Sequence, residues 1–71
     1  MNIAEIVKRA RERKGWSMKK LSEKSGVTQQ TIWNIENAKT NPTMDKMLAL
    51  MRAMDYDIVF KPKYKGGYYD D

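Results

Sequence analysis

The chain has no cysteine and no histidine among its 71 residues, and only two prolines and four glycines. The lack of cysteine excludes disulfides, and the lack of both residue types excludes Cys/His metal sites and histidine-based acid–base catalysis. No stretch approaches the roughly 18 consecutive apolar residues of a membrane-spanning helix. A cysteine-free chain without such a stretch fits a reducing compartment, so we expect a cytoplasmic protein with no membrane partner.

The small size of the chain limits it to one domain. A domain of 71 residues buries a smaller fraction of its surface than a large one, so its own stability is marginal. Because disulfides and Cys/His metal sites are unavailable, well-packed helices or a partner chain must supply the remaining stability.

Positive charge is concentrated in the first third of the sequence. The net charge is +5; residues 1–24 hold eight basic and three acidic side chains, whereas residues 25–42 hold one of each. Such a patch suits a phosphate backbone or an anionic membrane surface, although most basic runs are solvated helix faces. The nine acidic side chains form no cluster typical of an active site. We therefore expect no enzymatic activity, no metal site and no cofactor.

Two helices are predicted in the first 25 residues. Residues 1–14 carry apolar side chains at helical spacing, with Asn2 and Glu5 placed to form a capping box and Gly15 to end the helix. A second, short helix begins after the cap Ser17 and runs to about residue 24, where Ser25 and Gly26 break it.

Two further helices follow. The third runs from the cap Thr28 to residue 36 or 37, and residues 37–42 form a loop with asparagine and proline. Thr43 caps the fourth helix. We expect its apolar stripe to consist of Met44, Met47, Leu48, Met51 and Met54, with Leu50 on the shoulder.

At residue 56 the pattern changes to β-branched and aromatic side chains. Residues 56–61 predict one short strand, stopped by Pro62. Because no second strand is predicted, we expect it to pair with the same strand of a second copy through Tyr56, Ile58 and Phe60. The alternative is an irregular extension packed on the core. Residues 62–71 predict a flexible tail, and its tyrosines (Tyr64, Tyr68 and Tyr69) fit either a partner-binding segment or a solvated one.

The turn between the second and third helices carries the functional prediction. Ser25-Gly26-Val27 is so short that the two helices must meet at an angle, as in a helix-turn-helix motif. The side chains expected inside that angle are Leu21, Val27, Ile32 and Ile35. The opposite face holds four amides and an indole: Gln29, Gln30, Trp33, Asn34 and Asn37. Asparagine and glutamine amides can bind adenine in the major groove, so this face is predicted to read base edges.

Residues 11–54, and above all Gly15-Trp16-Ser17, residues 20–32 and Ile35-Glu36-Asn37, closely resemble the lambda-repressor/Cro-like helix-turn-helix family, of the xenobiotic-response-element type. The resemblance implies an all-α, compact four-helix DNA-binding domain (residues 1–61), with the short C-terminal strand similar to that of antitoxin-like members. It also implies a recognition helix at residues 28–37. The base-reading positions are Gln29, Gln30, Trp33 and Asn34, and the phosphate-binding positions are Thr28, Lys19, Asn37, Lys39 and Thr40.

Other implications of the resemblance are structural. Arg11 and Glu36 occupy positions that pair between the first helix and the end of the third. Ala38 replaces a usual glycine, so we expect Asn37 to adopt the left-handed conformation instead.

The residues themselves leave some roles open. Trp33 fits contact with a thymine methyl, with the sugar-phosphate edge or with neighbouring side chains. Lys14 and Lys20 fit either phosphate contacts or solvated positions.

These features predict a regulator that binds double-stranded DNA in a sequence-specific way. We expect a repressor that acts as a homodimer and reads pseudo-palindromic half-sites. The competing interpretation is an antitoxin whose main partner is a toxin protein, with DNA binding for autoregulation.

Overall fold

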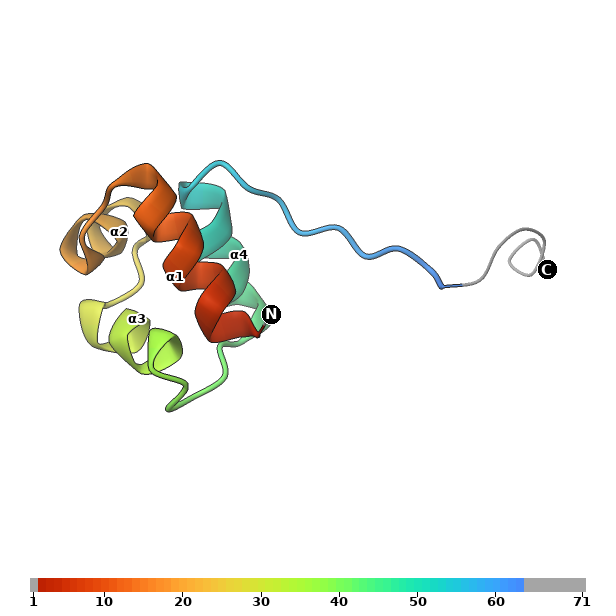
Figure 1. Ribbon diagram of the computed structural model, residues 1–71, viewed down its shortest axis with the longest axis horizontal. Coiled ribbons are helices and arrows are strands. Elements are labelled where there is room, and N and C mark those ends of the chain that lie inside the picture. Colours follow the sequence, from red (N-terminus) through yellow and green to blue (C-terminus); the bar gives the residue numbers. More distant parts are fainter. Residues whose placement is uncertain (1, 64–71) are drawn as a thin grey trace.

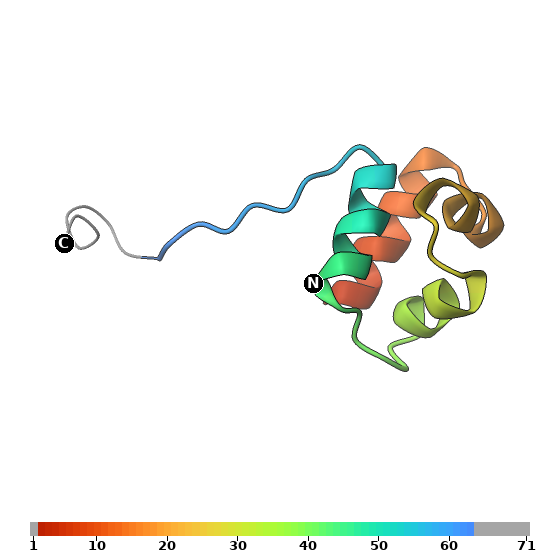
Figure 2. The same cartoon turned by 180° about the vertical axis from the view of Figure 1, so that it is seen from behind.

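The computed structural model describes residues 2–63 and contains four helices (Figure 1). They are α1 (Ile3–Lys14), α2 (Met18–Ser25), α3 (Gln29–Glu36) and α4 (Met44–Ala53). Both α1 and α2 pack against α3 and α4. The views from the front and from behind place α1 beside α4, with α2 and α3 on the same side of this pair (Figures 1 and 2). The four-helix, all-α prediction is confirmed.

The helix ends follow local capping chemistry. Asn2, Ser17, Thr28 and Thr43 each accept a hydrogen bond from the backbone N–H three residues later, and Asn2 and Glu5 form a complete capping box. Such caps satisfy backbone donors that the first turn leaves free. Gly15 and Gly26 end α1 and α2 in the left-handed conformation, with φ of 71° and 77°. All four predicted N-caps and both predicted glycine stops are confirmed.

The segment after α4 is extended and leaves the bundle on the side away from α2 and α3 (Figures 1 and 2). Residues 56–61 form no strand in this chain. A strand requires hydrogen bonds to a second strand, which residues 2–63 of one chain do not supply, so the predicted pairing between two copies stays a prediction. Ile58 packs against the core, whereas Val59 and Phe60 are 70% and 77% exposed. The predicted tail comprised residues 62–71, and all of it beyond residue 63, including its three tyrosines, lies outside the described residues.

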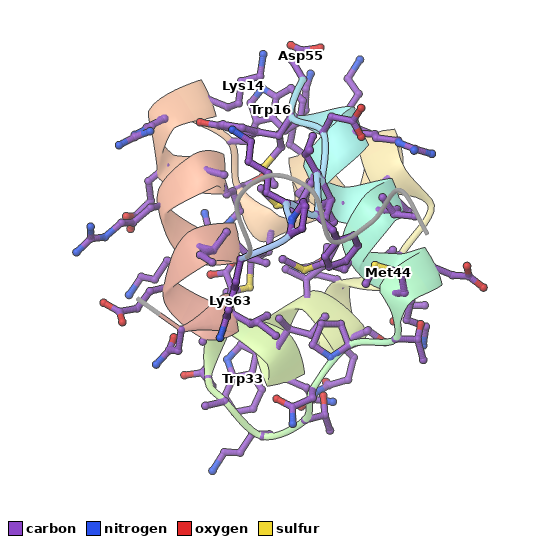
Figure 3. All side chains as sticks on the ribbon, turned by 90° about the vertical axis from the view of Figure 1, so that its right-hand side faces the viewer. Lys14, Trp16, Trp33, Met44, Asp55 and Lys63 are labelled. Carbon is purple, nitrogen blue, oxygen red and sulfur yellow. The ribbon has the colours of Figure 1, made fainter. Side chains whose placement is uncertain are left out.

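Ionic contacts hold the beginning of this segment against the ends of α1 and α4. Lys14 Nζ lies 2.6 Å from Asp55 Oδ2 and 5.4 Å from the centre of the Trp16 ring. Figure 3 shows these three side chains together at one end of the bundle. Arg52 Nε lies 3.6 Å from Asp57 Oδ1. Both ion pairs are largely exposed, and a backbone bond from the N–H of Tyr56 to the oxygen of Met51 at 2.9 Å ties the start of the segment to the end of α4.

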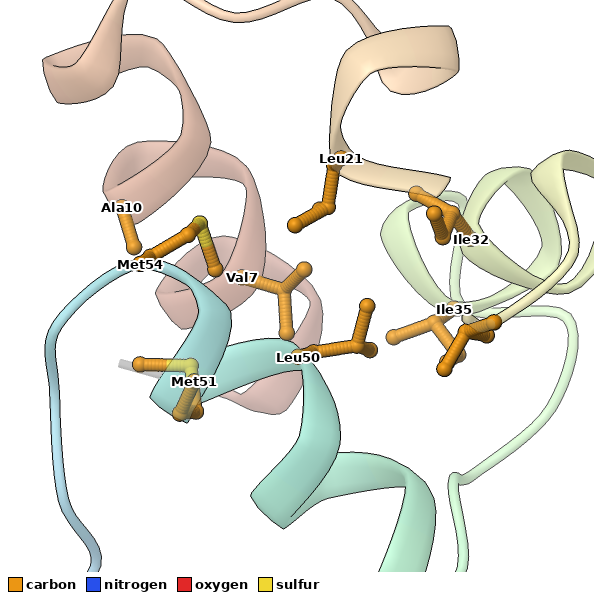
Figure 4. Packing of buried hydrophobic residues seen from close by; sticks show 9 residues of the cluster. Val7, Ala10, Leu21, Ile32, Ile35, Leu50, Met51 and Met54 are labelled. Carbon is orange, nitrogen blue, oxygen red and sulfur yellow. The ribbon is translucent and has the colours of Figure 1, made fainter. Parts of the chain in front are cut away.

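Nine buried apolar side chains form the core between the helices (Figure 4). The four residues predicted to fill the angle of the helix-turn-helix motif are all among them, which confirms that prediction. Trp16 is partly buried at the junction of α1 and α2 and packs against this core. The remaining core side chains come from α1, α4 and the residue that follows α4: Val7, Ala10, Leu50, Met51 and Met54.

The predicted apolar stripe of α4 is wrong at three positions. Leu50, expected on the shoulder, is fully buried, whereas Met44, expected in the stripe, is 49% exposed. Leu48, also expected in the stripe, is only partly buried and does not belong to the side chains that pack on the core. The face that meets the core holds residues 47, 50, 51 and 54, which is the i, i+3, i+4, i+7 spacing of one helix face. Within residues 2–63, no helix combines the length and the apolar character that a bilayer crossing requires.

Candidate nucleic-acid interface

Helix α3 has one buried face and one exposed, uncharged face. Ile32 and Ile35 are buried against the other helices. On the opposite side Gln29 and Gln30 are exposed, Trp33 is 43% exposed, and Asn34 is half-buried. Figure 3 shows Trp33 at the end of the bundle remote from Lys14 and Asp55. The four residues predicted to read bases therefore share one surface, which we call the amide face.

Hydrogen bonds along α3 orient several of these side chains. Gln30 Nε2 donates to Asn34 Oδ1 at 3.1 Å, and Thr28 Oγ1 donates to Thr31 Oγ1 at 2.7 Å. Asn37 Nδ2 donates to the backbone oxygen of Trp33 at 2.9 Å, so this amide closes the last turn of the helix. Within the described residues, no hydrogen bond of this kind involves the side chain of Gln29.

The turn after α3 corrects one expectation. Ala38 has the positive φ, 56°, whereas Asn37 has φ −98°. The backbone N–H of Ala38 donates to the backbone oxygen of Ile35 at 3.1 Å. The backbone N–H of Lys39 donates to the backbone oxygen of Asn34 at 2.8 Å. This pair of bonds is a Schellman motif, which requires the left-handed residue one position after the cap. The turn leaves Lys39 and Thr40 exposed directly beyond the amide face.

Glu36 supplies the one charge of α3, and Arg11 of α1 neutralises it. Arg11 Nε and Nη2 donate to the two carboxylate oxygens of Glu36 at 2.7 and 2.9 Å, and Nη1 donates to the oxygen of Trp16 at 2.7 Å. The hydrogen bond to Glu36 raises the pKa of Arg11 further, against the opposing effect of burial. The predicted pair is confirmed, and it keeps a negative charge away from the amide face.

A cation that the sequence analysis did not assign lies beside α3. Lys46, in the first turn of α4, lines a hollow of about 230 Å³ together with Asn34, Thr40 and Asn41. The sequence does not indicate that Lys46 lies beside α3, because only the packing of α4 and the path of the 37–43 loop bring it there. Within residues 2–63, no three acidic side chains gather where they could hold a metal ion.

Lys19 is exposed in the first turn of α2, the helix that packs on α3. Lys14 and the residues predicted for dimerisation lie apart from the amide face. Lys14 is paired with Asp55 at the opposite end of the bundle from Trp33 (Figure 3). Tyr56 lines a second hollow with Ile6 and Met51. Together with Ile58 and Phe60, it belongs to the segment that leaves the bundle on the side away from α2 and α3 (Figure 1).

Residues 7–61 match the model of a protein family described as helix-turn-helix. The chain belongs to the helix-turn-helix family. The matched region contains α2, the Gly26 turn and α3, and its last residues extend beyond α4. The family resemblance predicted from the motif is thus confirmed at this level.

Two curated relatives show how far the similarity extends. An uncharacterized HTH-type transcriptional regulator, y4dL, of Sinorhizobium fredii is 36% identical over 62 residues, which cover 87% of this chain and 32% of that protein. Antitoxin HipB of Escherichia coli K12 is 30% identical over 53 residues, covering 75% of this chain and 60% of that protein. The matched part of the chain therefore spans about a third of the first relative and three fifths of the second. No solved structure matches it significantly.

Proposed function

We propose that this chain is a sequence-specific regulator of transcription that binds double-stranded DNA, most simply as a repressor, through α3 in the major groove. The observation that carries the proposal is the amide face: an exposed, uncharged row of hydrogen-bonding side chains on the second helix of a helix-turn-helix motif. The similarity to a relative named as an HTH-type transcriptional regulator supports it. Within the family, we assign the chain to the xenobiotic-response-element type.

The proposed base-reading residues are Gln29, Gln30, Trp33 and Asn34. Glutamine and asparagine amides offer a donor and an acceptor together, which suits the N6 and N7 atoms of adenine. The indole of Trp33 suits the methyl group of thymine. Because Glu36 is paired with Arg11, no unpaired negative charge on α3 opposes the approach of the phosphates.

Phosphate contacts are proposed around the amide face: Thr28, Lys19, Asn37, Lys39 and Thr40, together with Lys46. Lys39 and Lys46 supply positive charge at the far end of α3, and Lys19 supplies it from α2. Asn37 retains one amide N–H beyond its bond to Trp33. Such contacts fix the register of the helix on DNA without reading sequence.

We further propose that two copies bind two half-sites about 10 base pairs apart. The exposed side chains of Val59 and Phe60 and the extended backbone of residues 56–61, which forms no strand within this chain, support association through this segment. Sedimentation equilibrium of the intact chain should give twice the mass of a single chain, and Phe60→Glu should give the single mass. Met44→Glu, which changes an exposed apolar residue of α4, should leave the dimer intact. A wild-type protein with the single mass would contradict the pairing.

A second candidate function is that of an antitoxin. It is favoured by 30% and 28% identity to two proteins named Antitoxin HipB, and by the exposed 56–61 segment on the side of the bundle away from α3 (Figure 2). A toxin held there would leave the amide face free for DNA. The discriminating observation is whether the neighbouring reading frame encodes a kinase-like or ribonuclease-like toxin.

Selection from a random pool of double-stranded DNA tests the main proposal. Repeated rounds of binding by the intact chain should enrich one pseudo-palindromic sequence. A pool that stays random after selection, while the protein remains folded by circular dichroism, would contradict sequence-specific binding.

A further inference from the structure

Two amides of the amide face are joined to each other. Gln30 Nε2 donates to Asn34 Oδ1 at 3.1 Å, across one turn of α3. Asn34 is half-buried, and its backbone oxygen accepts the amide of Lys39 at 2.8 Å. The backbone of Asn34 is therefore held by the turn that follows the helix, and its side chain is held by the bond from Gln30.

This bond decides which groups the pair can offer to DNA. One amide gives an N–H and the other an oxygen to the internal bond, so the opposite groups of the two side chains stay free. Here these are the oxygen of Gln30 and the NH₂ of Asn34. If both amides were turned over, the free groups would be the NH₂ of Gln30 and the oxygen of Asn34. In either arrangement one side chain presents an oxygen, and the other an NH₂ group, that takes no part in the internal bond.

We propose that Gln30 and Asn34 act as one unit that reads a single adenine, an inference that rests on the DNA-binding function proposed above. In the major groove adenine alone offers an acceptor, N7, beside a donor, N6, on one base. Guanine offers two acceptors, thymine an acceptor and a methyl group, and cytosine a donor. Trp33, between the two amides in the sequence, is 43% exposed and suits the methyl group of thymine.

The proposal differs from independent reading by each amide. Removal of either side chain also frees the other from its internal bond, so the remaining amide is no longer oriented. Each single substitution should therefore cost nearly as much as both together. Gln29, whose side chain is not bonded to this pair, should contribute independently.

A double-mutant cycle on selected DNA tests the unit. Sites are first selected by the wild-type chain from a randomised double-stranded pool. Affinities are then measured by fluorescence anisotropy for the wild type, Gln30→Ala, Asn34→Ala and the double variant, at one salt concentration. We expect all three variants to weaken binding by similar factors, between about five- and 150-fold. The control pair Gln29→Ala and Asn34→Ala should instead show factors that multiply.

A second arm leaves the protein unchanged. Each conserved adenine of the selected site is replaced in turn by 7-deazaadenine, which keeps base pairing but lacks the N7 acceptor. At one position per half-site, this replacement should weaken binding by the wild type. The same replacement should not weaken binding by the Gln30→Ala, Asn34→Ala double variant any further.

The outcomes separate this inference from the proposed function. If the wild type enriches no sequence, sequence-specific binding itself is wrong. If it enriches a site, but the factors for Gln30→Ala and Asn34→Ala multiply in the double variant, the unit is wrong and the regulator stands. The inference is also overturned if the position affected by the double variant is a G·C pair or is insensitive to 7-deazaadenine.

Discussion

At the scale of single residues, the pairing of Glu36 with Arg11 joins stability to function. The side chain of Glu36 is 2% exposed, and that of Arg11 is 13% exposed. A buried charge that loses its partner is strongly destabilising, whereas an exposed ion pair contributes little. The pKa of Arg11 is raised above its already high ordinary value by the bond to Glu36, so the stabilising contribution of its charge is present at neutral pH and, on the alkaline side, is lost as the pH rises through that raised pKa.

We expect Glu36→Ala to lower the free energy of unfolding by about 3–5 kcal/mol, because Arg11 would be left buried without its partner. Urea denaturation measures this change. The control Asp57→Ala, which removes an exposed contact with Arg52, should change it by less than about 1 kcal/mol. Arg11→Met with Glu36→Leu should recover part of the loss, though not the bond from Arg11 to the oxygen of Trp16. A Glu36→Ala effect no larger than the control would contradict this assignment.

Ala38 is a second residue whose local geometry has a measurable consequence. A left-handed residue with a Cβ costs about 1–2 kcal/mol, and glycine avoids this cost while losing more backbone entropy. We expect Ala38→Gly to stabilise the domain by about 0.5–1 kcal/mol, visible as a higher melting temperature. Ala49→Gly, in the interior of α4, should lower the melting temperature instead. A melting temperature lowered by Ala38→Gly would show that Ala38 carries no strain.

At the scale of elements, local chemistry predicts more than packing does. The N-caps, the two glycine stops and the short turn before α3 depend on residues a few positions apart, so the sequence was sufficient to place them. The exposed amide face followed from helical periodicity in the same way. The predicted base and phosphate contacts of these residues stay predictions.

The errors and omissions depend on contacts between distant segments. Leu50 is buried and Met44 exposed because α4 meets α1 and α2 through its later turns. Lys46 lies beside Asn34 because the 37–43 loop returns the chain to α3. The strand at residues 56–61 depends on a partner that the sequence of one chain cannot identify.

We expect Leu50→Ala to lower the free energy of unfolding by about 2–5 kcal/mol, because it opens a cavity at the centre of the core. Met44→Ala should change it by less than about 0.5 kcal/mol, since this side chain is half exposed at the start of α4. Urea denaturation of both variants measures the difference. If Leu50→Ala does not fold, Leu50→Met, which preserves volume, should still cost less than about 1.5 kcal/mol. Equal effects of Leu50→Ala and Met44→Ala would contradict the observed register of α4.

At the scale of the whole molecule, two surfaces are separated. The amide face lies on α3, and the segment with Val59 and Phe60 leaves the bundle on the side away from α2 and α3 (Figures 1 and 2). Such a separation allows the chain to bind DNA with one surface while a second copy or another protein occupies the other. Part of the basic excess of residues 1–24 is engaged elsewhere, since Lys14 and Arg11 pair with acidic side chains.

This arrangement predicts different effects for two substitutions at opposite ends of α3 in the proposed interface. Gln29→Ala should weaken binding to the selected site by about 1–3 kcal/mol and relax specificity at one base pair. Lys39→Ala should weaken binding to selected and random DNA alike and reduce the slope of log K against log salt by about 1. Fluorescence anisotropy titrations at several salt concentrations measure both effects. Identical behaviour of the two variants on both DNAs would contradict the assigned roles.

The central claim is that this chain distinguishes DNA sequences through α3. The most direct test is the ratio of its affinities for the site selected from a random pool and for a scrambled duplex of equal length and composition, at the same near-physiological salt concentration. We predict a ratio of at least about 10³, typical of specific DNA-binding proteins, and a marked fall in that ratio when Gln29, Gln30 and Asn34 are all replaced by alanine. A ratio near one for the folded wild-type chain would contradict the account.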